Sequence, residues 1–148
     1  MAYTISEAAG ISGICPYTIR FYDKQGLLPF MNRNRAGVRQ FSELDMECLE
    51  IISMLKATGM KIKEIKRYLD LCVLGDGALE QRLQFMRDHQ AEVRRQMEEY
   101  KQYMEVIGYK IWYYETAIDA GTEYIHDKHW EDTGENARRR YLREAGDG

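Results

Sequence analysis

The sequence has little cysteine and no long apolar run. Its only cysteines are Cys15, Cys48 and Cys72, which lie far apart and form no CxxC pair. This odd, scattered set argues against a disulfide framework and against a structural zinc site. Because no stretch of about 18 consecutive apolar residues occurs, no membrane-spanning helix is expected. The N-terminus has no basic segment followed by an apolar run, so we expect no secretion signal and a cytoplasmic location.

The residue patterns of common enzyme sites are also absent. The chain has no glycine-rich phosphate loop, no nucleophile elbow and no set of side chains with metal-ligand spacing. We therefore predict a protein that is not an enzyme and that has neither a cofactor nor a bound metal. The pair His126 and His129 is better explained as part of a solvated segment than as a metal site.

The charge of the chain is unevenly distributed. The formal net charge of −3 speaks by itself against nucleic acid. Residues 1–41, however, hold five basic and two acidic side chains, a net charge of +3. Residues 77–148 hold eleven basic and fifteen acidic ones, a net charge of −4. A basic head and an acidic body fit phosphate contact by the head alone.

Two short helices with a tight turn between them are predicted at the N-terminus. Thr4 and Glu7 form a capping box, so a helix should start there and end near residues 10–11. Pro16 suits the first position of a second helix, and Gly26 suits its end. The pair is a helix-turn-helix candidate, although such pairs also occur in plain helical bundles.

A short β-hairpin is predicted next. Pro29 and Gly37 disfavour a continuous helix, so we expect extended pieces at residues 28–31 and 38–41, joined by residues 32–37.

The hairpin segment contains three arginines, Arg33, Arg35 and Arg39. No acidic residue lies between Lys24 and Glu43. A solvated loop is one interpretation, but arginines without a compensating carboxylate favour phosphate binding.

Two further helices are predicted from caps and apolar periodicity. The third is capped at Ser42 and should run to about Thr58, and the fourth should span Lys61 to Cys72. Lys61 and Lys63 make the first turn of the fourth helix basic, against the preference of the helix dipole for acids. The basic first turn indicates either a binding site for an external anion or a chance arrangement of lysines.

A heptad pattern dominates residues 78–120. Apolar side chains recur in steps of four and three, with one polar interruption, at Leu79, Leu83, Met86, Gln90, Val93, Met97, Tyr100, Met104, Ile107, Ile111, Tyr114 and Ile118. One narrow stripe on so long a helix cannot be buried by a small head, so it needs a partner helix. The simplest partner is a second copy of the chain. Beyond Gly121 the chain turns polar, with a short helix predicted around residues 137–144.

These motifs together resemble a known family. The segments YTISEAA from Tyr3, PYTIRFYD from Pro16 and GLLP from Gly26, followed by GVRQF from Gly37, are similar to the N-terminal domain of MerR-type transcriptional regulators. The resemblance covers residues 3–71, about half of the chain.

The resemblance implies a mainly α fold: a winged helix-turn-helix head with a β-hairpin wing, followed by a long dimerisation helix in an antiparallel coiled coil. We expect a DNA-binding head at residues 1–74, the dimerisation helix at residues 78–120 and a C-terminal effector or tail segment at residues 121–148. The resemblance also implies a homodimer that binds a pseudo-palindromic promoter spacer. In response to an effector, the homodimer distorts this spacer so that RNA polymerase can engage the promoter.

The resemblance also implies which residues contact double-stranded DNA. The second helix should lie in the major groove, with Arg20 on a base edge or a phosphate and the Tyr22 hydroxyl on the backbone. The arginines of the hairpin should serve the wing, and Lys61 a second wing. The full expected set is Thr4, Tyr17, Thr18, Arg20, Phe21, Tyr22, Arg33, Arg35, Gly37, Arg39 and Lys61.

The chain departs from the family pattern at three positions. Val38 and Phe41 stand where tyrosines are usual, which puts hydroxyl contacts from the wing in doubt. Cys15 replaces the serine that usually caps the second helix, so a weaker cap is expected.

The effector is left open by the sequence. Thiolate metal sensing is disfavoured because no cysteine follows Cys72, and a redox role for Cys48 or Cys72 competes with inert packing. Aromatic residues crowd the C-terminal region. They fit either an interface between the coil end and a partner head or a pocket for a flat or cationic organic effector. The residues expected at such a pocket are Tyr109, Trp112, Tyr113 and Trp130.

A second function class is a coiled-coil scaffold whose head binds protein instead of DNA. The arginines of the hairpin disfavour it, because a scaffold does not need them.

Overall fold

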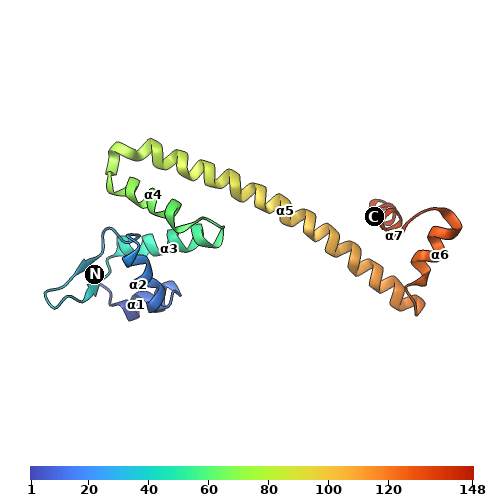
Figure 1. Cartoon of the computed structure of the whole chain (residues 1–148), viewed down its shortest axis with the longest axis horizontal. Coiled ribbons are helices and arrows are strands. Elements are labelled where there is room, and N and C mark those ends of the chain that lie inside the picture. The colour runs from blue at the N-terminus through green and yellow to red at the C-terminus, as the bar shows by residue number, and fades with distance from the viewer. The chain divides into compact units, whose positions relative to one another are not determined.

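A computed structural model describes all residues, 1–148, and its chain forms two compact units, Met1–Ala91 and Glu92–Gly148. The elements in order are α1 (Ile5–Ser12), α2 (Pro16–Lys24), β1 (Asn32–Arg33), β2 (Arg39–Gln40), α3 (Glu43–Ala57), α4 (Ile62–Val73), the 3-10 helix η1 (Gly75–Ala78), α5 (Leu79–Ala120), α6 (Tyr124–Thr133) and α7 (Ala137–Gly146) (Figure 1). The predicted mainly helical fold with one hairpin and one long helix is confirmed.

The first two helices begin and end at local signals. The Thr4 hydroxyl accepts a hydrogen bond from the Glu7 amide at 3.2 Å, and the Glu7 carboxylate accepts one from the Thr4 amide at 2.7 Å. This capping box satisfies amides that would otherwise lack partners at the start of α1. The helix continues to Ser12, slightly past the predicted end, and Gly13 then takes a left-handed conformation with φ of 71°. That glycine turns the chain sharply into α2.

The predicted position of the first strand was wrong, whereas the second strand lies within its predicted range. The extended residues are 32–33 and 39–40, with Arg33 paired to Arg39, so the first strand starts later than the predicted 28–31. The reason lies in the turn, where the Asn34 side-chain oxygen accepts hydrogen bonds from the amides of Ala36 and Val38, both at 3.0 Å. An asparagine that bonds its own following backbone closes a short turn. Residues 34–38 therefore form the connection, and residues 28–31 form a separate turn.

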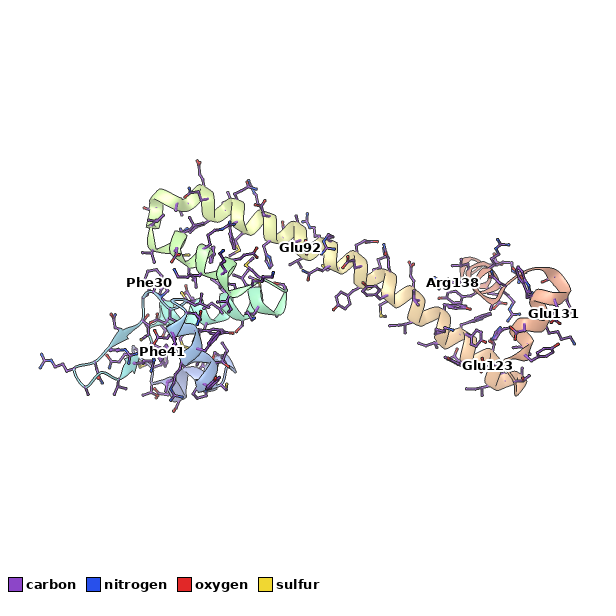
Figure 2. All side chains as sticks on the ribbon, viewed as in Figure 1. Phe30, Phe41, Glu92, Glu123, Glu131 and Arg138 are labelled. Atoms are coloured by element: carbon purple, nitrogen blue, oxygen red, sulfur yellow. The ribbon has the colours of Figure 1, made fainter.

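The core of the first unit lies where α1, α2, α3 and α4 meet. Phe41, which follows β2, is fully buried and is labelled in Figure 2. Its backbone pairs with Tyr3, which ties the N-terminus to the hairpin. The largest fully buried apolar side chains are Phe41, Ile19, Leu27, Leu49, Ile52, Leu55, Ile65 and Leu69.

The start of α5 belongs to the first unit because it packs on the head. The Phe85 ring stacks on Tyr68 of α4, with ring centroids 5.1 Å apart. Farther along α5, His89 is buried and its Nε2 forms a hydrogen bond of 2.7 Å with the Thr58 hydroxyl. Because of these contacts, the first compact unit includes the start of α5 and extends to Ala91.

The second unit consists of the rest of α5 with α6 and α7. The α6 helix was missed from the sequence, because Glu123 at its start makes no side-chain cap. Its end does carry a signal, a left-handed Gly134 with φ of 69°. None of the helices combines the length and the apolar character that crossing a bilayer would need.

Two leucines on α3 allow a matched test of the core. Leu49 is fully buried, whereas Leu44 is 46% exposed. Leu49→Ala should lower the free energy of unfolding by about 2–5 kcal/mol, because it leaves a cavity. Leu44→Ala should change that free energy by about 0.5 kcal/mol or less. Urea denaturation measures both, and equal losses for the two variants would contradict the described core.

Candidate nucleic-acid interface

The α2 helix presents one face to the core and another to solvent. Ile19 is fully buried and Tyr22 is only 7% exposed, while Tyr17, Arg20 and Phe21 are exposed. This division follows from helical spacing, since residues three and four apart share a face. Three of the predicted DNA contacts are thus gathered on one free surface. The Tyr22 side chain faces the core, so its expected hydroxyl contact with DNA stays a prediction.

The start of α2 has no side-chain cap. Cys15 makes no side-chain hydrogen bond to the helix backbone of the kind a serine cap makes, and its Sγ instead lies 3.1 Å from the Thr18 hydroxyl. That hydrogen bond, helped by backbone amides at the helix start, lowers the pKa of the Cys15 thiol from its ordinary value. Thr18, predicted to contact DNA, is half-buried and engaged with Cys15.

Two other predicted contacts lie at helix starts. The Thr4 hydroxyl both accepts from the Glu7 amide and donates to the Glu7 carboxylate at 2.9 Å, so it is used by the cap of α1. Lys61 is exposed at the N-cap position of α4 and makes no side-chain capping bond. The first turn of α4 also contains the acidic Glu64, and the contact of Lys61 with an external anion stays a prediction.

The hairpin is stabilised by its own backbone and by one arginine. Gly37 has φ of 78°, a conformation that favours glycine, and its amide donates to the Asn34 carbonyl at 2.9 Å. The Gly37 carbonyl accepts a hydrogen bond from Arg33 Nη1 at 2.9 Å. The predicted site residue Gly37 thus shapes the turn and holds Arg33.

The expectation that the hairpin arginines lack a carboxylate partner was wrong. Asp23, in the last turn of α2, accepts a hydrogen bond from Arg39 Nε at 2.8 Å, and its same oxygen lies 3.4 Å from Arg33 Nη2. The partner precedes the arginine-rich segment by many residues, so a search between Lys24 and Glu43 could not find it. Arg35 is exposed and makes no hydrogen bond or ion pair. The three arginines therefore differ in what they can offer to a phosphate.

An aromatic cluster forms in the second unit. Tyr109 on α5 lies 6.2 Å from Trp112 and 6.2 Å from Tyr113, measured between ring centroids. Tyr141 of α7 lies 5.7 Å from both Tyr109 and Trp112. Trp130, expected to join them, is 50% exposed and makes no ring contact with these residues. Three of the four predicted effector residues are therefore together, and Tyr141 was missed because it is far away in sequence.

Cations from the chain itself cover these rings. The Arg138 guanidinium lies 4.9 Å from the Tyr109 centroid, and Figure 2 labels this residue between α7 and α5. Arg140 lies 5.0 Å from the Trp112 centroid. The edges of the rings are also engaged, since Trp112 Nε1 donates to Glu144 at 2.9 Å. The cluster attracts cations and ties α7 to α5.

The two histidines of the tail have separate partners. His126 is buried and stacks on Tyr113 at 4.0 Å, with its Nε2 3.0 Å from the Tyr113 carbonyl. His129 instead lies 3.0 Å from the Glu135 carboxylate. No group of three or more His, Cys, Asp and Glu side chains is arranged to hold a metal ion.

The remaining cysteines differ from Cys15. Burial raises the pKa of the Cys48 thiol to about 11, so this group stays protonated near neutral pH. Cys72 is half-buried.

Comparison with known proteins relates the chain to DNA-binding regulators. Residues 3–72 match the family described as "MerR HTH family regulatory protein", and residues 46–107 match "MerR, DNA binding". The chain is 39% identical over 122 residues to an uncharacterized HTH-type transcriptional regulator of Haemophilus influenzae, covering 82% of this chain and 90% of the relative.

Solved structures agree with this relation. HiNmlR, a MerR family regulator lacking the sensor domain and bound to promoter DNA, is 38% identical with a TM-score of 0.78, covering 84% of this chain and 99% of that one. A MerR family transcriptional regulator from Bacillus thuringiensis is 39% identical with a TM-score of 0.70, covering 75% and 97%.

The contrast between Cys15 and Cys48 predicts selective thiol chemistry. Near pH 7.5, iodoacetamide should alkylate Cys15 well before Cys48, because Cys15 is exposed with a lowered pKa and Cys48 is buried with a raised one. Thr18→Ala should slow alkylation of Cys15, because it removes the hydroxyl that stabilises the thiolate. Peptide mass spectrometry follows both sites, and faster alkylation of Cys48 would contradict the prediction.

Proposed function

This chain belongs to the MerR family of DNA-binding transcriptional regulators, and from that premise we propose that it acts as a homodimer on promoter DNA. The dimer is supported by one observation on α5. The twelve heptad positions from Leu79 to Ile118 form an apolar ridge, and this ridge is largely exposed in a single copy. Met97 is 66% exposed and Ile118 is 77% exposed. A continuous exposed apolar surface of this kind marks an interaction site.

A second copy fits the ridge better than any element of the same chain. The α5 helix has 42 residues and is thus about 63 Å long. Burying its side chains against an identical helix removes about 25 cal/mol of unfavourable free energy per Å² of apolar surface. Family resemblance supports an antiparallel arrangement of the two helices. In this proposal residues 1–74 form the DNA-binding head, residues 78–120 the dimerisation helix and residues 121–148 an effector segment.

The head supplies the proposed DNA contacts. We place the exposed face of α2 in the major groove, where Arg20 can donate two hydrogen bonds to a guanine or one to a phosphate. The exposed Arg35 and Lys61 suit backbone phosphates on either side. HiNmlR, bound to promoter DNA, supports this arrangement by its similarity. The proposed contact set is Thr4, Tyr17, Thr18, Arg20, Phe21, Tyr22, Arg33, Arg35, Gly37, Arg39 and Lys61.

A pair of heads held by one coil suits a pseudo-palindromic operator. Such a dimer can bend or untwist the spacer between promoter elements and thereby change how RNA polymerase engages the same promoter. The coiled-coil scaffold with a head that does not bind DNA is not favoured, since the relatives are transcriptional regulators. Because the protein acts on promoter DNA, we propose a cytoplasmic location.

A small organic effector is proposed to act at the aromatic cluster of Tyr109, Trp112 and Tyr113. The faces of these rings already hold guanidinium groups, so the cluster is suited to a flat or cationic molecule that competes with Arg138 or Arg140. Trp130 lies outside the cluster and contributes only if it moves on binding.

Arg20 offers a direct test of the DNA-binding face. Arg20→Ala should weaken operator binding by about 1–3 kcal/mol, because a base or phosphate contact is lost, without changing the dimer. Fluorescence anisotropy with labelled operator DNA measures the loss, and light scattering checks the mass. Lys56→Ala, which removes one exposed cation from α3, serves as the control. Equal operator affinities for the two variants would show that Arg20 does not lie in the DNA interface.

The ridge can be tested by placing charges on it. Val93→Glu combined with Met97→Glu should produce monomers and abolish operator binding, since buried carboxylates cannot be solvated in the seam. The matched control places the same charges off the ridge, at Ala91→Glu and Gln102→Glu, and should remain dimeric. Light scattering distinguishes the variants, and a dimeric Val93/Met97 double variant would refute the proposed seam.

A further inference from the structure

Asp23 connects the DNA-facing helix to both strands of the hairpin. Its carboxylate lies in the last turn of α2 and is 18% exposed. One oxygen accepts from Arg39 on β2 at 2.8 Å and approaches Arg33 on β1 at 3.4 Å. Arg33 in turn donates to the Gly37 carbonyl in the turn. A single carboxylate therefore reaches both strands and, through Arg33, the tip of the hairpin.

The carboxylate adds to the few bonds that hold the hairpin, which are its own backbone pairs, the Asn34 side chain and the Tyr3–Phe41 bridge. Each strand has only two residues, and an isolated hairpin is at best marginally stable in water. Arg33 and Arg39 are also directly opposite one another in the register, where like charges repel. Asp23 replaces that repulsion with two attractive contacts and fixes the orientation of the hairpin relative to α2.

We propose that Asp23 is a positioning residue that sets how strictly this protein discriminates between DNA sequences. This inference rests on the proposed function, in which α2 and the hairpin contact DNA together. Arg33 and Arg39 then also act as parts of the hairpin, since Asp23 accepts one N–H from each guanidinium group. Arg35, which has no partner, is the arginine of the hairpin that is free to bind a phosphate.

The same carboxylate works against general DNA affinity. A negative charge beside a DNA-facing surface repels phosphates and competes with them for Arg33 and Arg39. Its presence therefore favours discrimination over affinity: a fixed hairpin fits only duplexes that suit the geometry of α2, whereas a released hairpin adapts to any phosphate backbone. A purely structural role would lower the affinity for all DNA alike.

The test uses Asp23→Asn, which keeps the side-chain shape and removes the charge. The ligands are an operator duplex, selected by the wild-type full-length chain from a random pool, and a scrambled duplex of equal length. The variant should bind scrambled DNA more tightly, and its ratio of operator to scrambled affinity should fall about tenfold. The slope of log affinity against log salt should steepen by about one to two units, because one or two arginines gain phosphates.

Two controls separate charge from position. Glu47→Gln removes an exposed carboxylate from α3 of the same head and should leave the ratio and the salt slope unchanged. Asp23→Glu keeps the charge and should keep most of the wild-type ratio of operator to scrambled affinity. Equal losses on both duplexes with an unchanged slope, or an identical response of Glu47→Gln, would overturn the proposal.

A measurement without DNA keeps this inference separate from the proposed function. Hydrogen exchange of the Asn34 and Val38 amides reports on the hairpin in the free protein. Asp23→Asn should speed exchange of the Asn34 amide, which donates across the hairpin to the Val38 carbonyl. Unchanged exchange would show that Asp23 does not hold the hairpin. A wild-type chain that selects no duplex would instead contradict the proposed DNA contacts.

Discussion

The apolar ridge of α5 extends along more helix than one copy of this chain can cover. Its side chains recur every three or four residues from Leu79 to Ile118, and most remain exposed to water in a single copy. Near the start of the helix the first unit covers mainly a different face, where Phe85 and His89 contact the head, and of the ridge Met86 packs partly against the head core. The cost of leaving the ridge in water favours a second α5, and the proposed dimer follows from that requirement.

The head uses the division of α2 into a buried and an exposed face. Ile19 and Tyr22 anchor the helix in the core, so Tyr17, Arg20 and Phe21 are held outward on a rigid element. Rigid placement matters because base contacts depend on geometry, whereas general attraction to DNA depends on charge. The ion pairs of Asp23 extend this rigidity to the hairpin. In a dimer, two such heads would contact DNA at a spacing fixed by the coil.

The features that the sequence predicted well are local ones. The capping boxes at Thr4 and Ser42 mark where α1 and α3 begin, and both are present. The heptad pattern predicted a helix over 78–120, and α5 spans Leu79–Ala120, because apolar spacing is decided within the helix. The first strand was predicted at the wrong residues although a local signal existed, namely the side chain of Asn34.

Contacts between distant residues could not be predicted in the same way. Asp23 meets Arg39 across 16 positions, and Tyr141 meets Tyr109 from another helix, so neither pair is visible as a pattern in the chain. Trp130 was grouped with the other rings by composition alone, but its place on α6 leaves it exposed. Aromatic density indicated where a cluster forms, and packing decided which rings belong to it.

Sedimentation equilibrium of the wild-type chain at micromolar concentration shows whether two copies associate through the ridge. The chain has a mass of 17.4 kDa, and we expect a single species of twice that mass, because a second copy covers the ridge. A species that stays at the mass of one chain across that concentration range would contradict it.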